Sequence, residues 1–459
     1  MSLQLAFYGD DFTGSTDALE VLAFAGLRTA LFLEPPTPAA LRNAGPLDAF
    51  GVAGDSRAMS PQEMDRELPP VFDALARSGA PIVHYKVCST FDSSPTVGSI
   101  GRAMEIARRS FGPRFIPVVG GTPSLRRYCA FGHLFARSAT DDQVYRIDRH
   151  PIMSEHPVTP MTESELRRHI GMQAPLALEN FSFPQLEAGH EAAVAHLQSL
   201  LATGPDGVVF DSMSAGHITS VGRLLSQHAA KAAPLFVVGP SGVEYALTQW
   251  WREARLLSTT VVNYSRFRRV DRALAISASA SALSAQQIDA AIAAGFAELS
   301  VDAAALLDER RWRGTVDQLV AAAAQQLKRG HSVILHTARG SHDPRIKAAL
   351  EELEAQGLAR ERARHEGGRL LGQRLGQIAR EVLRSVAVER LLLSGGDTSS
   401  QIVKALAPEA LLVAARLSPG APLCRLVSGE SWLHGLEVAL KGGQMGDIDF
   451  FQTARLGRP

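Results

Sequence analysis

The sequence predicts a protein of the α/β class, built from two α/β domains whose mainly parallel sheets face each other across a cleft. The chain has 459 residues, which is too long for one ordinary domain and suits two. Short apolar strands alternate with amphipathic helices along both halves, a pattern typical of parallel sheets with helical crossovers. A polar segment at residues 258–271 interrupts this alternation. We therefore expect one domain over residues 1–257 and a second over residues 271–459.

The composition narrows the class of function. Hydrophobic residues make up 46% of the chain and charged residues 20%, which is a globular profile. Lys plus Arg and Asp plus Glu number 47 each, so the formal net charge is zero and nothing favours nucleic acid as a partner. No apolar run approaches the roughly 18 residues of a spanning helix, and the start of the chain lacks signal-peptide features. The prediction is a cytoplasmic protein that binds neither nucleic acid nor membrane.

The cysteines and two of the histidines argue against a metal centre. Cys88, Cys129 and Cys424 are far apart and form no CxxC pair, which argues against a disulfide framework or a zinc site. His150 and His156 lack the HxxxH spacing of helical metal ligands. They lie in residues 145–160, which carry three prolines and little periodicity, so we expect a long ordered loop or flap there.

The first predicted unit is a strand at residues 3–8, a turn-rich loop at residues 9–17 and a helix at residues 18–27. The loop holds two adjacent carboxylates, Asp10 and Asp11, whose mutual repulsion is costly unless a cation or a hydroxyl-rich ligand compensates it. A loop between a strand and its following helix is where α/β proteins usually bind ligands. The alternative is that one of the two aspartates merely caps the helix.

Two further predicted strands end in charged or hydroxylated residues. The strand Ala49–Ala53 precedes Arg57, and the strand at residues 81–87 carries Lys86 and is followed by Ser89 and Thr90. Arginine suits a bidentate contact with a carboxylate, and lysine suits a point contact with carboxylate or phosphate. Together with the two aspartates, these side chains predict a rim that binds a small, polyhydroxylated anion. A single cation at a strand end is more often an ordinary surface charge.

The rest of the first half continues the alternation. We expect helices at 61–76, 98–109, 163–171, 185–201, 222–231 and 243–255. We expect strands at 115–119, 176–179, 207–211 and 235–238. In the second half we expect strands at 273–276, 299–301 and 332–335, helices at 284–294 and 316–329, and strands between 411 and 427. Residues 345–384 are predicted as largely helical, with a break at Gly367-Gly368.

Three turns of the second half have the composition of phosphate-binding loops. The stretch 391–406 is an apolar strand, then Gly395-Gly396, then hydroxylated and acidic helix starters with apolar helix positions behind them. A second turn, 277–281, is rich in serine, and a third, 441–447, has three glycines beside a lysine. Backbone N–H groups at a helix N-terminus suit a phosphate. Such turns are common, so a purely structural role stays open. Two domains, one for a hydroxy acid and one for a nucleotide, suit phosphoryl transfer with water excluded.

The whole chain resembles the four-carbon acid sugar kinases. The resemblance rests on five segments in order: 9–14 (Gly-Asp-Asp-Phe-Thr-Gly), 55–57 (Asp-Ser-Arg), the Lys86 segment, 394–399 (Ser-Gly-Gly-Asp-Thr-Ser) and 441–447. Residues 85–95 and 145–160 are similar to the 3-oxo-tetronate kinase branch. The resemblance implies an amino-terminal acid-sugar domain and a carboxy-terminal nucleotide domain. It also implies ATP and Mg²⁺ as cofactors and transfer of phosphate to the terminal 4-hydroxyl of 3-oxo-tetronate, which releases ADP.

The resemblance also implies roles for individual residues. Asp10 and Asp11 would orient or deprotonate the attacking hydroxyl. The expected substrate-binding residues are Asp10, Asp11, Arg57, Lys86, Ser89 and Thr90. The expected ATP-binding residues are Ser277, Ser279, Gly395, Gly396, Asp397, Thr398, Gly442 and Gly443. Asp397 would hold Mg²⁺ directly or through water.

Two departures from the family pattern leave alternatives open. Ala278 stands where the family usually has glycine, and the ending 441–446 reads Lys-Gly-Gly-Gln-Met-Gly instead of Lys-Ser-Gly-Asn-Phe-Gly. The altered 277–279 turn favours one alternative, a non-catalytic nucleotide or sugar-acid binding protein. The other alternative is a sister kinase acting on threonate, erythronate or a related sugar acid, against which the segment 88–95 argues. A homodimer is compatible with the sequence.

Overall fold

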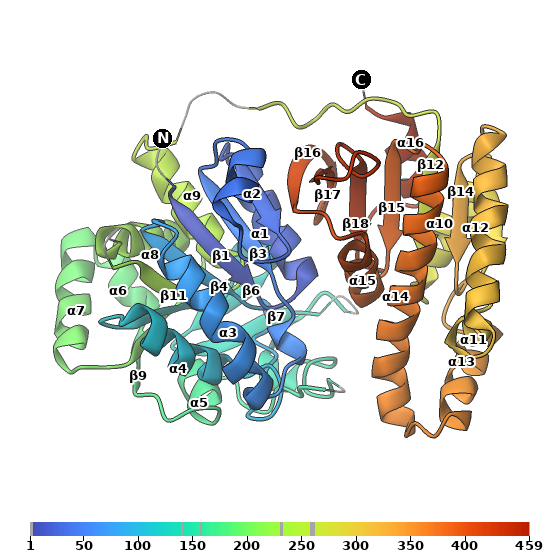
Figure 1. The fold of residues 1–459 in the computed structure, drawn as a ribbon. Helices are drawn as coiled ribbons and strands as arrows, with labels where there is room; N and C mark the ends of the chain where they lie inside the picture. Colours follow the sequence, from blue (N-terminus) through green and yellow to red (C-terminus); the bar gives the residue numbers. More distant parts are fainter. Residues whose placement is uncertain (1–2, 139–140, 157, 230–232, 258–261, 459) are drawn as a thin grey trace. The chain divides into compact units, whose positions relative to one another are not determined.

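The computed structural model describes residues 3–138, 141–156, 158–229, 233–257 and 262–458, and for residues 360–365 and Asp397 it describes the backbone alone. The chain forms two compact units (Figure 1). Unit 1 comprises Met1–Leu41 and Gly45–Val261, and unit 2 comprises Arg42–Ala44 and Val262–Pro459. Both units are mixed α/β structures, as the sequence predicts. In the part of the chain that is described, no helix is long and apolar enough to cross a membrane.

Unit 1 is built on a fully parallel sheet of eight strands. Their spatial order is β2 (Thr29–Phe32), β3 (Ala49–Ala53), β1 (Leu5–Gly9), β4 (Ile82–Lys86), β11 (Leu235–Gly239), β5 (Ile116–Val119), β10 (Gly207–Phe210) and β9 (Leu178–Phe181). The strands from β2 to β10 are buried throughout, which explains their nearly continuous apolar sequences.

The crossovers of unit 1 are helical. They are α1 (Phe12–Phe24), α2 (Pro38–Asn43), α3 (Pro61–Ala76), α4 (Ile100–Phe111), α5 (Leu166–Gly171), α6 (Phe183–Glu187), α7 (His190–Ala202), α8 (Ala215–His228) and α9 (Gly242–Glu253). Helix α3 begins with a capping box between Ser60 and Glu63 and has proline at its first position, so its start is well specified. Phe72 of α3 packs edge-on against the stacked rings of Tyr8 and Tyr85 beneath the carboxyl end of the sheet.

The chain changes direction across the sheet of unit 1 between β1 and β4. Strand β1 leads through α1 to β2 on one side, whereas its neighbour β4 leads through α4 to β5 on the other side. At such a switch point the two following loops diverge and leave a crevice at the carboxyl end of the strands, where α/β proteins bind ligands. The residues that follow β1 and end β4 are Asp10 and Lys86.

A separate antiparallel sheet of three strands was not predicted. It consists of β6 (Arg127–Ala130), β7 (His133–Arg137) and β8 (Val144–Arg146). The buried carboxylate of Asp211 accepts hydrogen bonds from the backbone N–H groups of Phe131 and Gly132, at 2.5 and 2.9 Å, and so fastens the β6–β7 turn to the end of β10. The long loop predicted at residues 145–160 is not a loop throughout, because its first part forms the end of β8 and a short 3₁₀ helix (Ile147–Arg149).

Unit 2 has a seven-stranded sheet of mixed direction. Its order is β13 (Ala297–Ser300), β14 (Val333–His336), β12 (Ala273–Ser277), β15 (Arg390–Ser394), β18 (Glu437–Lys441), β17 (Ala421–Val427) and β16 (Ala410–Ser418). The pairs β16–β17 and β17–β18 are antiparallel. Strand β12 leads to β13 on one side and its neighbour β15 leads to β16 on the other, so a second switch point lies between Ser277 and Ser394, which are register partners.

The helices of unit 2 correct one prediction. They are α10 (Ala282–Ala293), α11 (Ala303–Leu307), α12 (Trp312–Lys328), α13 (Pro344–Ala355), α14 (Arg360–Ser385), α15 (Gly396–Leu406) and α16 (Phe450–Leu456). The predicted break at Gly367-Gly368 is wrong, because α14 continues through both glycines. A Cβ at Gly367 would overlap Leu353 of α13, so this glycine permits close helix packing instead of ending the helix.

Several helix boundaries in unit 1 also differ from the sequence prediction, among them the start of α8, which lies at Ala215 and not at residue 222. The predicted loop at residues 9–17 is short, because α1 already begins at Phe12, capped by Asp11. The predicted helix at 185–201 is two helices, α6 and α7, separated at Gly189, whose φ of 93° lies in the region that favours glycine.

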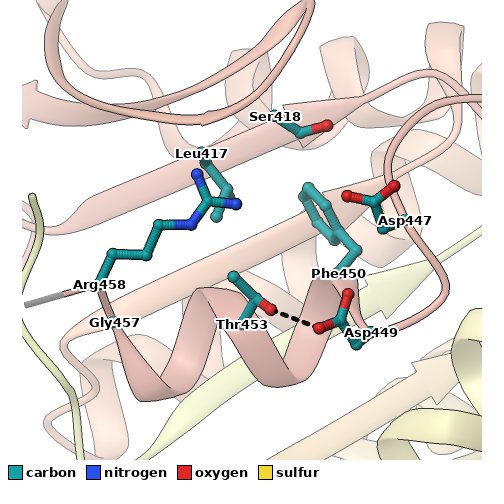
Figure 2. A pocket seen from close by; sticks show the side chains of 8 residues that line it. All are labelled: Leu417, Ser418, Asp447, Asp449, Phe450, Thr453, Gly457 and Arg458. Carbon is teal, nitrogen blue, oxygen red and sulfur yellow. Dashed lines mark hydrogen bonds between the residues drawn. The ribbon is translucent and has the colours of Figure 1, made fainter. Parts of the chain in front are cut away.

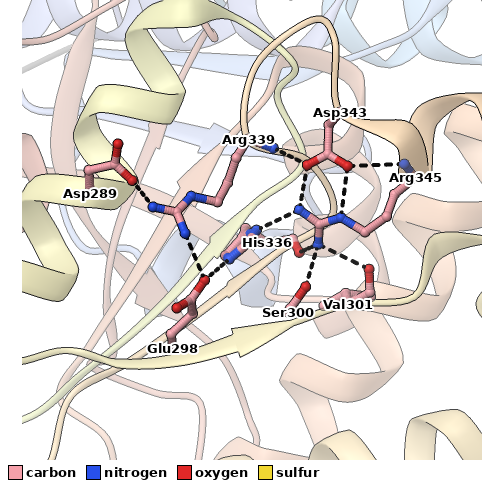
Figure 3. A network of polar contacts seen from close by, with 8 residues as sticks. All are labelled: Asp289, Glu298, Ser300, Val301, His336, Arg339, Asp343 and Arg345. Carbon is pink, nitrogen blue, oxygen red and sulfur yellow. Dashed lines mark hydrogen bonds and ion pairs between the residues drawn. The ribbon is translucent and has the colours of Figure 1, made fainter.

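A polar network fixes the loop after β14 in unit 2 (Figure 3). Arg345, near the start of α13, donates to Asp343 at 2.7 and 3.0 Å and to the backbone carbonyl of His336 at 2.9 Å. The network also contains Asp289, Glu298, Ser300, Val301 and Arg339. Each of its three carboxylates is paired with an arginine inside the network, so we interpret it as a structural support for the end of the strand next to Ser277.

Candidate active site

Asp10 and Arg57 form a two-pronged ion pair at the switch point of unit 1. Arg57 Nε and Nη2 donate to the two carboxylate oxygens of Asp10 at 3.1 and 2.7 Å. The backbone supports the pair, since Asp10 N–H donates to the carbonyl of Lys86 at 2.9 Å and Arg57 N–H donates to the carbonyl of Asp10 at 3.0 Å. The loops after β1, β3 and β4 are thus joined at one point. The planar guanidinium matches the carboxylate geometry, which fixes the orientation of both groups.

The side chain of Asp11 accepts two hydrogen bonds, both through Oδ1. This atom accepts from the N–H of Gly14 at 2.8 Å, which caps α1, and from Arg57 Nη2 at 2.9 Å. The capping alternative is therefore correct for Asp11. Its second oxygen, Oδ2, receives no hydrogen bond from the described residues, and about a quarter of the side chain is exposed. Asp11 can cap the helix and still offer Oδ2 to a ligand.

Lys86 completes this group, which we call the four-residue cluster: Asp10, Asp11, Arg57 and Lys86. Its buried ammonium donates to the carbonyl of Val87 at 3.2 Å and lies 3.8 Å from Asp17. Burial lowers the pKa of Lys86, but the carboxylates of Asp17, Asp11 and Asp10 outweigh it, so the net shift is upward and the lysine stays charged. Asp17 was not among the predicted site residues. It lies on α1, six positions after Asp11.

The cluster with Asp17 holds three carboxyl groups and two cations. One carboxyl group therefore lacks a full counter-charge, which favours retention of a proton. Burial raises the pKa of Asp10 to about 6, against the lowering effect of Arg57. Burial likewise raises the pKa of Asp17. These carboxyl groups can thus exchange a proton near neutral pH, while Lys86 stays charged and can attract an anion.

The predicted substrate residues Ser89 and Thr90 lie just beyond the cluster. Thr90 Oγ1 donates to Asp92 at 2.8 Å and lies 3.0 Å from Cys88 Sγ. Ser89 is partly exposed, and the described contacts do not connect it to the cluster. The structure therefore brings Asp10, Asp11, Arg57 and Lys86 together, and it places Ser89 and Thr90 on the neighbouring loop without linking them to those four residues.

The predicted nucleotide residues of unit 2 gather at its switch point. The N–H of Ala278 donates to the carbonyl of Ser394 at 2.8 Å, and the N–H of Gly395 donates to the carbonyl of Lys441 at 3.0 Å. The loops after β12, β15 and β18 thus meet. Gly396 and Thr398 lie in the first turn of α15. The side chain of Asp397 lies outside the described part, so its predicted contacts stay predictions.

Two glycines at this switch point are tightly surrounded, so a side chain there would displace its neighbours. Gly395 has a φ of 129°, and a Cβ there would lie 3.3 Å from the backbone of Ala278. A Cβ at Gly443 would overlap Ser279 Oγ. Gly443 is held by Ser281 Oγ, which donates to its carbonyl at 2.5 Å. Gly442, one residue earlier, leads into this turn from β18.

The same place leaves buried polar groups without partners. Ser277 Oγ and Ser399 Oγ are buried and have no hydrogen-bond partner within the described chain. Lys441 is buried, its ammonium donates to the carbonyl of Gly442 at 3.3 Å, and it forms no ion pair within the described chain; burial lowers its pKa to about 8. Buried hydroxyls without partners and a buried ammonium without a counter-ion are costly unless a ligand meets them. Together with the N-terminus of α15, they fit a phosphate group of ATP.

Lys441 and Ser399 were not predicted as site residues. The position of the lysine before Gly442-Gly443 was a signal in the sequence, but nothing there marked the side chain as buried. For Mg²⁺, the described residues contain no group of three or more His, Cys, Asp or Glu side chains that could hold a metal ion. Magnesium commonly binds through substrate phosphates and one or two carboxylates, so a metal carried by the nucleotide remains compatible with this donor set.

A cavity of about 320 Å³ lies in unit 2 between the end of β16 and helix α16 (Figure 2). Its walls are Leu417, Ser418, Asp447, Asp449, Phe450, Thr453, Gly457 and Arg458. The ring centroid of Phe450 lies 5.7 Å from the ammonium of Lys441, so the cavity adjoins the loop after β18. Its volume is at the lower end of the range for small-molecule sites.

In comparisons with known proteins, each half of the chain matches a separate domain model. Residues 5–247 match a model described as a sugar-binding N-terminal domain, and residues 274–451 match a nucleotide-binding C-terminal domain. A 3-oxo-isoapionate kinase from Paraburkholderia graminis is 42% identical over 99% of this chain and 95% of its own length. A 3-oxo-tetronate kinase from Pseudomonas fluorescens is 30% identical over 98% of this chain and 96% of its own.

Two solved structures share the fold. A Salmonella typhimurium LT2 protein has a TM-score of 0.77 at 23% identity, covering 98% of both chains. A Haemophilus influenzae protein has a TM-score of 0.74 at 21% identity, covering 98% of this chain and 99% of its own. The α/β fold and the matched domains define a class of phosphotransferase. This chain belongs to the four-carbon acid sugar kinase family.

Proposed function

We propose that the protein is an ATP-dependent kinase that phosphorylates a hydroxyl group of a 3-oxo sugar acid. The observation that carries the proposal is the four-residue cluster at the switch point of unit 1, in a chain of this family. It combines a carboxylate oxygen of Asp11 that has no hydrogen-bond partner among the described residues with the buried cation of Lys86. An acceptor that has both hydroxyl and carboxylate groups matches this pair of features.

The substrate we propose first is 3-oxo-isoapionate, with 3-oxo-tetronate second. The sequence favoured 3-oxo-tetronate, to be phosphorylated at its terminal 4-hydroxyl. The relative named for 3-oxo-isoapionate is 42% identical, against 30% for the Pseudomonas fluorescens relative named for 3-oxo-tetronate. This difference in identity supports placing 3-oxo-isoapionate before 3-oxo-tetronate as the proposed substrate. Both acids carry the hydroxyl and carboxylate groups that the four-residue cluster suits.

The residues divide the chemical work as follows. Asp11 Oδ2 accepts the hydrogen bond of the attacking hydroxyl and takes its proton as the new bond to phosphorus forms. Arg57 keeps Asp10 and Asp11 in place, and Lys86 attracts the anionic substrate. The nucleotide phosphates are bound by the side chains of Ser277, Ser279, Ser399 and Lys441 and by the backbone at Gly395, Gly396, Gly442 and Gly443. Thr398, in the first turn of α15, belongs to the same binding site. Bound Mg²⁺-ATP supplies the phosphoryl group, and Asp397 remains our proposed metal ligand.

The experiment is a coupled ADP-release assay with Mg²⁺-ATP and five acceptors: 3-oxo-isoapionate, 3-oxo-tetronate, D-threonate, L-threonate and D-erythronate. We expect turnover with the 3-oxo acids only, fastest with 3-oxo-isoapionate. Turnover with threonate or erythronate instead would keep the kinase and refute the 3-oxo preference. ATP binding without turnover on any acid would favour the second candidate, a non-catalytic binding protein, to which Ala278 in the Ser277–Ser279 turn gives some support.

A further inference from the structure

A third cation lies at the same edge of unit 1 as the four-residue cluster. Arg127 is the first residue of β6, which follows β5 after a short connection. Its backbone exchanges two hydrogen bonds with Thr122, at 2.8 and 3.2 Å, and Thr122 is buried next to the carboxyl end of β5. The three-stranded sheet thus holds Arg127 at the edge where the ligand-binding loops of unit 1 lie.

The guanidinium of Arg127 is only partly satisfied. Nη1 donates to the backbone carbonyls of Leu125, Arg126 and Arg137 at 3.2, 3.3 and 3.3 Å. Nε is buried and has no hydrogen-bond partner among the described residues, and within that part of the chain Arg127 forms no ion pair with a carboxylate. Its neighbour Arg126, by contrast, is exposed and pairs with Asp142 at 3.3 Å.

A half-buried guanidinium without a counter-ion is unfavourable, because it loses hydration and gains no opposite charge. Burial, with a contribution from the charge of Arg137, lowers the pKa of Arg127. A bound anion would remove this cost, and a carboxylate fits the planar edge of a guanidinium.

Arg127 begins the strand that follows β5, and in the sheet β5 is separated by β11 from β4, the strand that Lys86 ends. Arg127 is within electrostatic range of Cys88, and Arg57 is within range of the same thiol. Cys88 follows Lys86 by two positions, and burial raises its pKa to about 11, so the thiol is neutral and is not the missing counter-ion. The two arginines therefore approach the loop after β4, but Arg57 is paired with Asp10 and Asp11 and Arg127 has no such partner.

We propose that Arg127 binds the carboxylate of the sugar-acid substrate through the edge of its guanidinium that carries Nε. The assignment rests on the proposed function and adds to it the residue that selects an acid over a neutral sugar. Asp10 and Asp11 serve the reacting hydroxyl. Lys86 attracts the anionic substrate as a point charge but is already surrounded by the carboxylates of Asp10, Asp11 and Asp17, so a planar, bidentate contact with the substrate carboxylate needs a separate cation. Arg127 is the arginine near this edge that is left without a carboxylate partner in the described chain.

The test is calorimetric titration of the full-length protein with D-erythronate and with D-erythronamide, which lacks the charge. Charge-assisted hydrogen bonds contribute about 1.5–3 kcal/mol, so Arg127→Gln should weaken erythronate binding roughly 10- to 100-fold. The same variant should change erythronamide binding less than about twofold, since the interaction it loses is absent there. Arg127→Lys should be intermediate, because it keeps the charge and loses the planar edge.

Arg126→Gln is the matched control and should leave both affinities unchanged. Equal weakening of both ligands, no weakening of erythronate, or no erythronate binding by the wild-type protein would each overturn the assignment. If Arg127→Gln does not fold by circular dichroism, Arg127→Lys carries the comparison. The titration needs no ATP, so a protein that binds erythronate through Arg127 but releases no ADP would refute the kinase function and leave the carboxylate assignment standing.

Discussion

Arg57 contacts both oxygens of Asp10, at 3.1 and 2.7 Å, and the same Nη2 atom reaches Asp11 at 2.9 Å. One guanidinium thus orders two adjacent carboxylates that would otherwise repel each other. Asp10 uses both of its oxygens in this pair, whereas Asp11 keeps Oδ2 for a ligand. The two aspartates are therefore not equivalent, and the account assigns the acceptor hydroxyl to Asp11.

The first prediction concerns Asp11. Asparagine can still cap α1, because its side-chain oxygen can accept from Gly14, but it cannot take a proton. Asp11→Asn should lower kcat by about 10²–10⁴ and leave the Kd for ATP nearly unchanged. Steady-state kinetics and calorimetry measure the two quantities. Near-normal kcat would remove Asp11 from the reaction.

The second prediction concerns the pairing of Asp10 with Arg57. Arg57→Met leaves a buried carboxylate without its counter-ion and should destabilise unit 1 by about 3 kcal/mol. Adding Asp10→Asn removes that carboxylate, so the double variant should recover much of the loss. Thermal unfolding followed by circular dichroism compares the three proteins. If the double variant melts at or below the melting temperature of Arg57→Met, the loss of stability in Arg57→Met does not come from the unpaired carboxylate of Asp10.

The third prediction is a pH dependence of ATP binding. Burial lowers the pKa of Lys441 to about 8, so its ammonium loses its proton as the pH rises through that value. The positive charge near the phosphates is present below pH 8 and lost above it, and ATP affinity should therefore fall between pH 7 and pH 9.5. Calorimetric titration with ATP across this range measures the effect.

The control for this prediction is Lys441→Arg, which stays charged throughout the range and should show little pH dependence. Lys441→Met should bind ATP weakly at every pH. A wild-type profile that is flat, or one that Lys441→Arg reproduces, would show that Lys441 does not contact the nucleotide.

The fourth prediction uses the tight contact at Gly443. A Cβ there would overlap Ser279 Oγ, so Gly443→Ala should displace the turn and weaken ATP binding roughly tenfold or more, by analogy with the 1–3 kcal/mol cost of overpacking. The matched control is Gly314→Ala in α12, where a Cβ meets nothing within 4 Å. Equal ATP affinities for Gly443→Ala and Gly314→Ala would contradict the contact.

The sequence predicted the parts of the site that depend on strand ends. Asp10, Arg57 and Lys86 each follow or end a short apolar strand, and parallel strands bring such residues to one edge, so their meeting followed from the strand pattern. The three-stranded sheet with Arg127 could not be predicted in this way. Its strands are only partly buried, β8 has three residues, and the sheet is fastened by Asp211, which is distant in sequence.

Burial explains most of what the sequence did not show. Lys441 and Arg127 look like ordinary cations in the sequence, and only the fold reveals that they lack carboxylate partners in the described chain. The helix start at Phe12 was placed too late because the polar residues 13–17 lack an apolar stripe, although Ser15 and Thr16 are buried within α1. At the start of α1, tertiary contacts thus overrode local helix propensity.

The most direct test of the central claim is release of ADP by the wild-type protein with Mg²⁺-ATP and a 3-oxo sugar acid, with Asp11→Asn measured beside it. We expect rapid, acceptor-dependent release by the wild type with 3-oxo-isoapionate or 3-oxo-tetronate, and loss of that release in Asp11→Asn. Absence of acceptor-dependent ADP release by a wild-type protein that binds ATP and the acid would contradict it.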